Sequence, residues 1–193
     1  MEITSFNQLD LNKTYTYADY LLWKFKDRIE LFKGKVFKMS PAPARIHQKV
    51  LLNITRTFDN YFQNHPCELY FAPFDVRLPN KNGDIFTVLQ PDLCVVCDLD
   101  KLDDKGCLGA PDLIVEILLP GNTKKELDLK YSIYEEAGVL EYWIVHPTDK
   151  NIQVFVLENG IYIGLKPATE GEMITSRTFP ELSFSTDEIF GNL

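Results

Sequence analysis

The sequence predicts an α/β protein of mixed α+β type, with a mixed central β-sheet flanked by helices and extra β-hairpins. Residues 91–98 and 112–119 carry apolar side chains on both faces, which is typical of central strands. Residues 44–64 place an apolar side chain at every fourth position, which predicts an amphipathic helix. The order of strand 112–119, helix 124–137 and strand 140–145 indicates a crossover that packs the helix on the sheet.

The remaining elements follow from local signals. The stripe of the long helix consists of Ile46, Val50, Ile54, Phe58 and Phe62. The helix at 124–137 has Thr123 and Glu126 spaced as a capping box at its start and Gly138 at its end. Further predicted elements are a short helix at 16–23, a hairpin of 28–32 and 36–39 around Gly34, an extended segment at 69–78, a hairpin of 152–157 and 161–165, and a short strand near 182–184.

Composition favours one globular domain over residues 1–193, with a core at about 17–156 and a C-terminal β extension at about 151–193. The chain is 45% hydrophobic and 25% charged, close to the globular average. It has no apolar run near the roughly 18 residues of a spanning helix and no basic-then-apolar leader. We therefore expect a cytoplasmic protein that does not enter a membrane.

The net charge of −8 argues against a general nucleic-acid coat, because phosphate neutralisation dominates such binding. A local basic groove remains compatible with this charge. Cations gather in one stretch, although a solvated charged surface is the simpler interpretation for most of them: Lys24, Lys26, Arg28, Lys33, Lys35 and Lys38.

Four cysteines occur, at positions 67, 94, 97 and 107. Cys94 and Cys97 form a CxxC pair, but on a strand residues three apart point to opposite faces and cannot share one ion. We therefore expect buried, reduced thiols.

Glu116 lies inside the apolar run Asp112–Pro120, where an unpaired carboxylate would be costly. A cation should compensate it. Asp92 begins the preceding central strand, and Lys130 lies on the following helix. A hard ion such as Mg²⁺ (or Mn²⁺) takes one or two carboxylates plus waters and phosphate oxygens. Asp92 and Glu116 could supply this pair, with Lys130 neutralising charge nearby.

Three stretches together resemble the Uma-type family of prokaryotic endonucleases within the PD-(D/E)XK restriction-endonuclease-like superfamily. They are Pro91-Asp92, the run from Asp112 to Ile117, and the run from Lys130 to Val145. The resemblance also takes in Arg28 to Val36 and His47, so it covers roughly residues 17–156. It implies a Mg²⁺-dependent phosphodiesterase that acts on DNA, with Asp92 and Glu116 as metal ligands, Lys130 as a catalytic residue and Glu30 as the early acidic residue of the site.

The chain departs from these patterns at three places. The superfamily's lysine normally stands two residues after the second carboxylate, where this chain has Leu118; Lys130 matches the Uma-type position on the next helix. A Ser-Pro-Ser-Thr-like segment is replaced by Leu119 to Asn122. The family usually has an aspartate four residues before the lysine, and this chain has Glu126 at that position.

Each candidate residue also admits a structural role. Asp92 could bond backbone amides, Glu116 could form a buried ion pair with Lys130, and Glu30 could be an ordinary strand residue. His47 and Tyr134 could simply be packed side chains.

At the level of function, two alternatives to the nuclease stay open. One is a non-catalytic nucleic-acid-binding or scaffold protein that keeps the fold, and the other is a hydrolase of a small phosphorylated molecule. A homodimer is a further expectation, because a duplex target suits two-fold symmetry.

Overall fold

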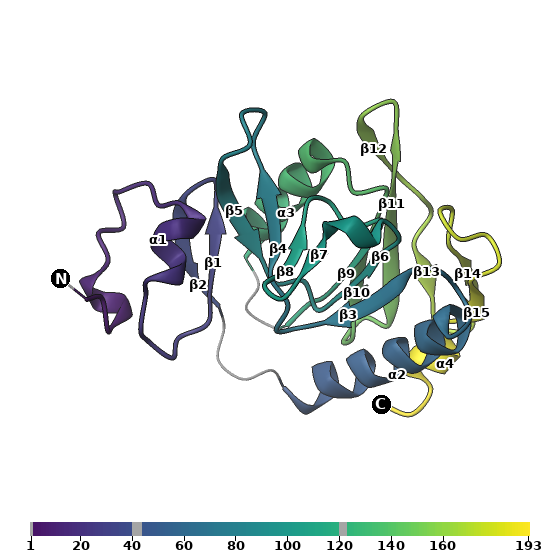
Figure 1. Ribbon diagram of the computed structural model, residues 1–193. Helices are drawn as coiled ribbons and strands as arrows, with labels where there is room; N and C mark the ends of the chain where they lie inside the picture. Colours follow the sequence, from purple (N-terminus) through teal and green to yellow (C-terminus); the bar gives the residue numbers. More distant parts are fainter. Residues whose placement is uncertain (1, 40–43, 120–122) are drawn as a thin grey trace.

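The computed structural model describes residues 2–39, 44–119 and 123–193 (Figure 1). Its largest sheet has seven strands. In spatial order the path is β12 (Ile161–Gly164), β11 (Asn151–Glu158), β10 (Glu141–His146), β9 (Leu113–Ile117), β6 (Leu93–Val96) and β3 (Glu68–Phe71), and β13 (Ala168–Thr169) pairs with β11 off this path. β9 and β10 are parallel and are joined through α3 (Lys124–Ala137), so the predicted crossover is confirmed.

A second sheet of six strands stands beside the first. Its order is β2 (Lys35–Lys38), β1 (Ile29–Phe32), β5 (Ile85–Leu89), β4 (Val76–Pro79), β8 (Gly106–Leu108) and β7 (Leu102–Asp103). A small third sheet pairs β14 (Met173–Thr175) with β15 (Ser183–Ser185). The other helical elements are η1 (Phe6–Gln8), α1 (Tyr17–Leu21), α2 (Arg45–Phe62), η2 (Leu99–Lys101) and α4 (Asp187–Phe190).

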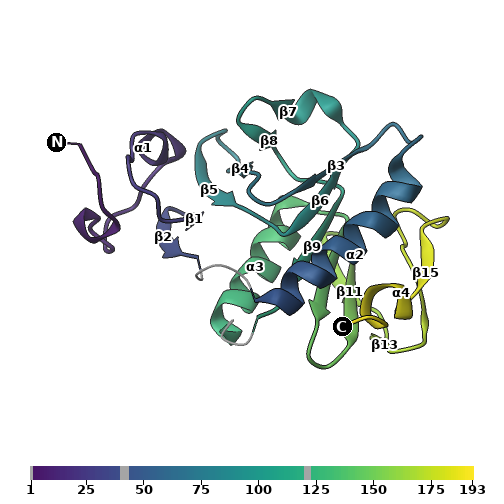
Figure 2. The same ribbon diagram turned by 90° about the horizontal axis from the view of Figure 1, so that it is seen from below.

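The two faces of the seven-stranded sheet belong to different cores. On one face Val115 and Ile117 of β9 pack with the apolar stripe of α2 and with the C-terminal elements. On the other face Ile114 packs with α3 and with the six-stranded sheet. Figures 1 and 2 show α2 and α3 on opposite sides of this sheet. The alternation along β9 therefore directs Glu116, which shares a face with Ile114, towards α3.

The helix boundaries follow the predicted signals closely. The Thr123 hydroxyl accepts a hydrogen bond from the Glu126 amide at the start of α3, and Gly138 ends the helix in the left-handed conformation at φ 87°. The stripe of α2 is buried at Val50, Ile54, Phe58 and Phe62. None of the described helices is long and apolar enough to cross a membrane.

The structure corrects the predicted extended segment at 69–78. It consists of two strands, β3 and β4, that belong to different sheets, and residues 72–75 carry the chain from one to the other. β5 was not predicted from the sequence, although it lies at the centre of the second sheet. Local propensity indicates extended backbone, but it does not indicate which sheet a strand joins.

The expectation of reduced thiols in the CxxC pair is wrong for Cys97 and confirmed for Cys94. Cys67 and Cys97 form a disulfide, whereas Cys94 and Cys107 are free and buried. The antiparallel register of β3 and β6 pairs Glu68 with Val96, which brings Cys67, just before β3, opposite Cys97, just after β6. The predicted opposite orientations are confirmed, because Cys94 packs on the α3 side and Cys97 on the α2 side.

Glu141 attaches the C-terminal segment to the sheet. It is fully buried at the start of β10. Its Oε1 accepts from Trp143 Nε1 at 2.7 Å, and its Oε2 accepts from Ser176 Oγ at 2.7 Å and from the amides of Arg177 and Thr178 at 3.0 and 2.7 Å. Because both oxygens are hydrogen-bonded, the buried charge is compensated by neutral donors.

We expect Glu141→Ala to lower the free energy of unfolding by about 3–5 kcal/mol, because it strands several buried donors without a partner. Glu141→Gln keeps one accepting oxygen and should cost about 1–3 kcal/mol. Urea denaturation followed by tryptophan fluorescence measures both values. A loss of unfolding free energy below about 1 kcal/mol in the alanine variant would contradict the role of Glu141 in attaching the C-terminal segment to the sheet.

Candidate functional site

Glu116 of β9, Lys130 of α3 and Glu30 of β1 meet in one buried cluster. The Lys130 ammonium lies 2.8 Å from Glu116 Oε1 and 3.3 Å from Glu30 Oε1. The three residues are between 3% and 7% exposed. The crossover explains the meeting, because β9 leads into α3 and α3 packs back over the face of β9 that carries Glu116.

Asp92 joins the same region from the loop before β6. Its Oδ2 accepts the amide of Ile117, the neighbour of Glu116, at 2.7 Å. His47 Nε2 lies 3.2 Å from the same oxygen, and the histidine is buried on α2. The Asp92 side chain is 19% exposed, more than any of the three clustered residues. The four residues expected from the sequence, Glu30, Asp92, Glu116 and Lys130, are therefore brought together.

Two tyrosines complete the surroundings of Glu116. The Tyr134 hydroxyl donates to Glu116 Oε1 at 2.8 Å, from one turn beyond Lys130 on α3. Burial raises the pKa of Tyr134 well above its usual value, and the Glu116 charge acts in the same direction, so the hydroxyl keeps its proton. The Tyr142 hydroxyl is buried and has no hydrogen-bond partner among the described residues.

Gln90 links the cluster to the second sheet. Its amide nitrogen donates to Glu30 Oε1 at 2.8 Å, and its side-chain nitrogen donates to Asp75 Oδ1 at 2.8 Å. Its side-chain oxygen accepts from Arg28 Nε and Nη2 at 3.3 and 3.0 Å. Gln90 therefore fixes the orientation of Glu30 and holds an arginine beside it.

The charges at this centre do not balance. Among the described residues, Glu30, Asp92 and Glu116 face one ammonium, that of Lys130, and the His47 imidazole lies beside Asp92. Burial raises the pKa of Glu116 to about 7; Lys130 opposes this rise, while Asp92 and Glu30 add to it. Burial lowers the pKa of Lys130, but Glu116 and Glu30 outweigh it and hold this pKa above its usual value. The centre therefore carries one firmly protonated lysine and an excess of negative charge.

The donor set fits a small hard cation bound by two carboxylates. Asp92 uses Oδ2 and Glu116 uses Oε1 for the bonds described above, while Asp92 Oδ1 and Glu116 Oε2 take no hydrogen bond from the described residues. Within those residues no group of three or more His, Cys, Asp or Glu side chains could hold a metal ion. Two carboxylates with open oxygens match Mg²⁺, which keeps several waters, better than an ion that demands an all-protein cage.

Sequence reasoning understated two residues and missed one. The sequence pattern indicates packed side chains for His47 and Tyr134, yet each contacts a carboxylate of the cluster. A signal existed for His47, because it lies three residues before Val50 and continues the buried stripe of α2. Gln90 directly follows β5, the strand that was not predicted, so its position beside Glu30 could not be inferred.

The structure also places Leu118 and Glu126, two positions at which the chain departs from the pattern that it resembles. Leu118, which occupies the usual lysine position, is partly buried against the core between α3 and the six-stranded sheet. Residues 120–122 lie outside the described residues. Glu126 supplies the amide that Thr123 caps.

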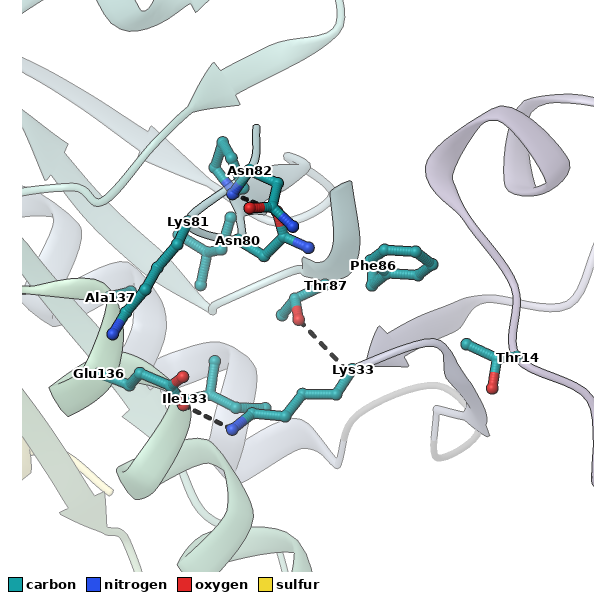
Figure 3. A pocket seen from close by; sticks show the side chains of 12 residues that line it. Thr14, Lys33, Asn80, Lys81, Asn82, Phe86, Thr87, Ile133, Glu136 and Ala137 are labelled. Atoms are coloured by element: carbon teal, nitrogen blue, oxygen red, sulfur yellow. Dashed lines mark hydrogen bonds and ion pairs between the residues drawn. The ribbon is translucent and has the colours of Figure 1, made fainter. Parts of the chain in front are cut away.

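A cavity of about 510 Å³ lies apart from this centre (Figure 3). It is lined by the turn after β1, the turn between β4 and β5, and the end of α3. Lys33 and Glu136 form an ion pair of 2.5 Å at its wall, and the Lys33 amide donates to Thr87 Oγ1. None of Glu30, Asp92, Glu116 and Lys130 lines it. The carboxylate centre is thus a separate site.

We expect Lys130→Met to lower the free energy of unfolding by about 3–5 kcal/mol in metal-free buffer, because it leaves buried carboxylates without their counter-charge. The double variant Glu116→Gln/Lys130→Met should cost less than the sum of its single variants by about 1 kcal/mol or more. Denaturant unfolding of all four proteins measures this coupling. Additivity within about 0.5 kcal/mol would show that the pair contributes nothing to stability.

Comparison with known proteins identifies a similar fold. A crystal structure described as "a putative nuclease belonging to DUF820 from Anabaena variabilis ATCC 29413" matches with a TM-score of 0.71 at 16% sequence identity. The match covers 92% of this chain and 98% of that chain, which shows a common fold and confirms the predicted restriction-endonuclease-like architecture. No curated protein matches the sequence.

The family comparison reaches further along the chain than the motifs did. A model described as "Uma2: Putative restriction endonuclease" matches residues 17–187, including most of the C-terminal extension. The resemblance expected from the motifs is confirmed, and the chain belongs to the Uma2 family.

Proposed function

We propose that this protein is a metal-dependent endonuclease that hydrolyses phosphodiester bonds in DNA, with a centre of the PD-(D/E)XK type. The observation that carries the proposal is the meeting of Asp92 and Glu116, each with one open carboxylate oxygen, beside the buried ammonium of Lys130. Family membership supports a nuclease. A purely structural ion pair does not explain why the buried carboxylates outnumber the cations beside them.

Asp92 and Glu116 would hold Mg²⁺ or Mn²⁺. When bound, this ion lowers the pKa of a water molecule and neutralises charge on the phosphoryl group. The open oxygens Asp92 Oδ1 and Glu116 Oε2 are the available donors. The ion would also relieve the negative excess that burial makes costly at this centre.

Lys130 provides the fixed positive charge. Glu116 and Glu30 hold its ammonium in one place and keep it protonated, so its charge can stabilise negative charge that develops on a phosphate. Glu30 is in turn oriented by the Gln90 amide. His47 and the Ile117 amide fix Asp92 Oδ2 and so set the orientation of the carboxylate. Its other oxygen, Oδ1, is then available to the ion.

The direct test is cleavage of supercoiled plasmid in Mg²⁺ or Mn²⁺. Asp92→Asn and Glu116→Gln should each lower the rate by about a thousandfold or more, because each removes a charged ligand of the ion at nearly constant shape. Asp104→Asn and Glu158→Gln, which alter exposed carboxylates, are the matched controls and should cleave like the wild type. Full activity in either site variant would exclude the assignment.

A non-catalytic nucleic-acid-binding or scaffold protein is the second candidate. The observation that favours it is the low exposure of Lys130 and Glu116, whose contact is also what a purely structural ion pair would show.

Calorimetric titration with Mn²⁺ separates the two functions. The endonuclease should bind the ion, and Glu116→Gln and Asp92→Asn should each abolish the binding heat. Unchanged heat in both variants would place the ion elsewhere. Nucleic-acid binding with no ion uptake would favour the scaffold.

A further inference from the structure

The cations of the basic stretch at 24–38 divide into two groups. Three of them are occupied within the protein: Lys33 pairs with Glu136 at 2.5 Å, Lys38 pairs with Asp27 at 2.5 Å, and Lys35 donates to the carbonyl of Asn12 at 2.5 Å. These three lysines fasten the first hairpin to its surroundings. Their ammonium groups are therefore already paired or hydrogen-bonded within the protein.

The other three cations are not neutralised. Lys24 and Lys26 make no side-chain hydrogen bond or ion pair with any described residue, and Arg28 contacts only the neutral side-chain amide of Gln90. All three are exposed. In a chain with a net charge of −8, three neighbouring cations without a carboxylate partner form a local positive surface.

The exposure pattern indicates that the three cations share one side of the backbone. Residues 24–28 lie outside the helices and strands of the structure, and their exposure alternates, with Phe25 and Asp27 partly buried between the exposed cations. Phe25 stacks on Trp23, and Asp27 faces Lys38. In an extended chain, alternate residues on one side are about 6.6 Å apart. Three such cations can each reach a different phosphate of one strand, since phosphates repeat about every 3.4 Å along a duplex.

This row of cations leads into the carboxylate centre. Arg28 immediately precedes β1, and strand alternation places it on the same side as Glu30. The connection is explicit, because Arg28 bonds Gln90, Gln90 bonds Glu30 and Glu30 contacts Lys130. In Figure 1 the segment between α1 and β1 runs along the lower side of the molecule, the side on which α2 begins.

We propose that Lys24, Lys26 and Arg28 form a phosphate track that binds several backbone phosphates along one strand of duplex DNA and guides this strand to the carboxylate centre. The proposal rests on the nuclease function proposed above and adds the surface that receives the substrate. The track reads no bases, because phosphate contacts position a duplex without specifying its sequence. The track explains how a protein with a net negative charge can bind DNA, which is also negatively charged.

The test measures binding of a fluorescent DNA duplex at several salt concentrations, with a chelator present so that no cleavage occurs. Lys24→Ala/Lys26→Ala/Arg28→Ala should weaken binding at low salt and reduce the slope of log K against log salt by about 2.7, or about 0.9 for each lost contact. Lys24→Ala/Lys26→Ala leaves the Arg28–Gln90 contact intact and should reduce the slope by about 1.8.

The charge-matched control is Lys105→Ala/Lys166→Ala/Arg177→Ala. These cations are exposed; Lys105 adjoins β7, at the opposite end of the six-stranded sheet from β1 and β2, and the other two lie in the C-terminal part. Because they contact no phosphate in this proposal, the slope should stay at the wild-type value. An equal slope change in the control and track triples would overturn the track, since binding would then follow net charge alone.

Failure of the track is distinguishable from failure of the proposed function. If the wild type cleaves plasmid and binds the duplex but the track variants keep its slope, the track is wrong and the nuclease stands. If the wild type binds no DNA even at the lowest salt, both proposals fall. Circular dichroism of every variant confirms that the fold is intact before binding is compared.

Discussion

The constraint on which the site depends is the burial of Glu116 in the central strand β9. A carboxylate there loses its water, and the loss must be offset by charge-assisted bonds of good geometry. Lys130 and Tyr134 supply them, both to Oε1 and both from α3. Residues four apart on a helix lie on one face, so a single helix position satisfies both contacts. The packing of α3 on β9 therefore also supplies the contacts that the Glu116 carboxylate needs.

For the proposed PD-(D/E)XK type of centre, this arrangement explains how a lysine from a helix can take the place of one from the strand. On β9 the position two residues after Glu116 is filled by Leu118, which packs against the core between α3 and the six-stranded sheet. The crossover returns α3 over the same face of the sheet, so Lys130 delivers its ammonium to the carboxylate from above the strand. A lysine can bury its long aliphatic stem and still place its ammonium at the carboxylate, whether it comes from the helix or from the strand. Only the position of the charge matters.

Most of the helices and strands can be predicted from the sequence, and so can the four residues of the centre, Glu30, Asp92, Glu116 and Lys130. The prediction fails where the structure depends on pairing between strands that are distant in the chain. Periodicity located α2 and α3, and the run around Glu116 located β9, because these signals are local. The pairing of β3 with β6, which joins Cys67 to Cys97, depends on a register between strands separated in the chain. Gln90 was missed for the same reason, since its role arises only when β5 lies beside β1.

Glu116 and Glu141 show which buried glutamate suggests chemistry. Both are buried on adjacent strands of one sheet, and both lie in apolar stretches of sequence. Glu141 has both oxygens saturated by neutral donors from Trp143 and the C-terminal segment, so its role as a tether accounts for it completely. Glu116 has one oxygen bound to an ammonium and a hydroxyl, while its other oxygen accepts no hydrogen bond from the described residues. Burial is common to the two residues; the open oxygen, beside a second carboxylate, is what makes Glu116 a candidate ligand.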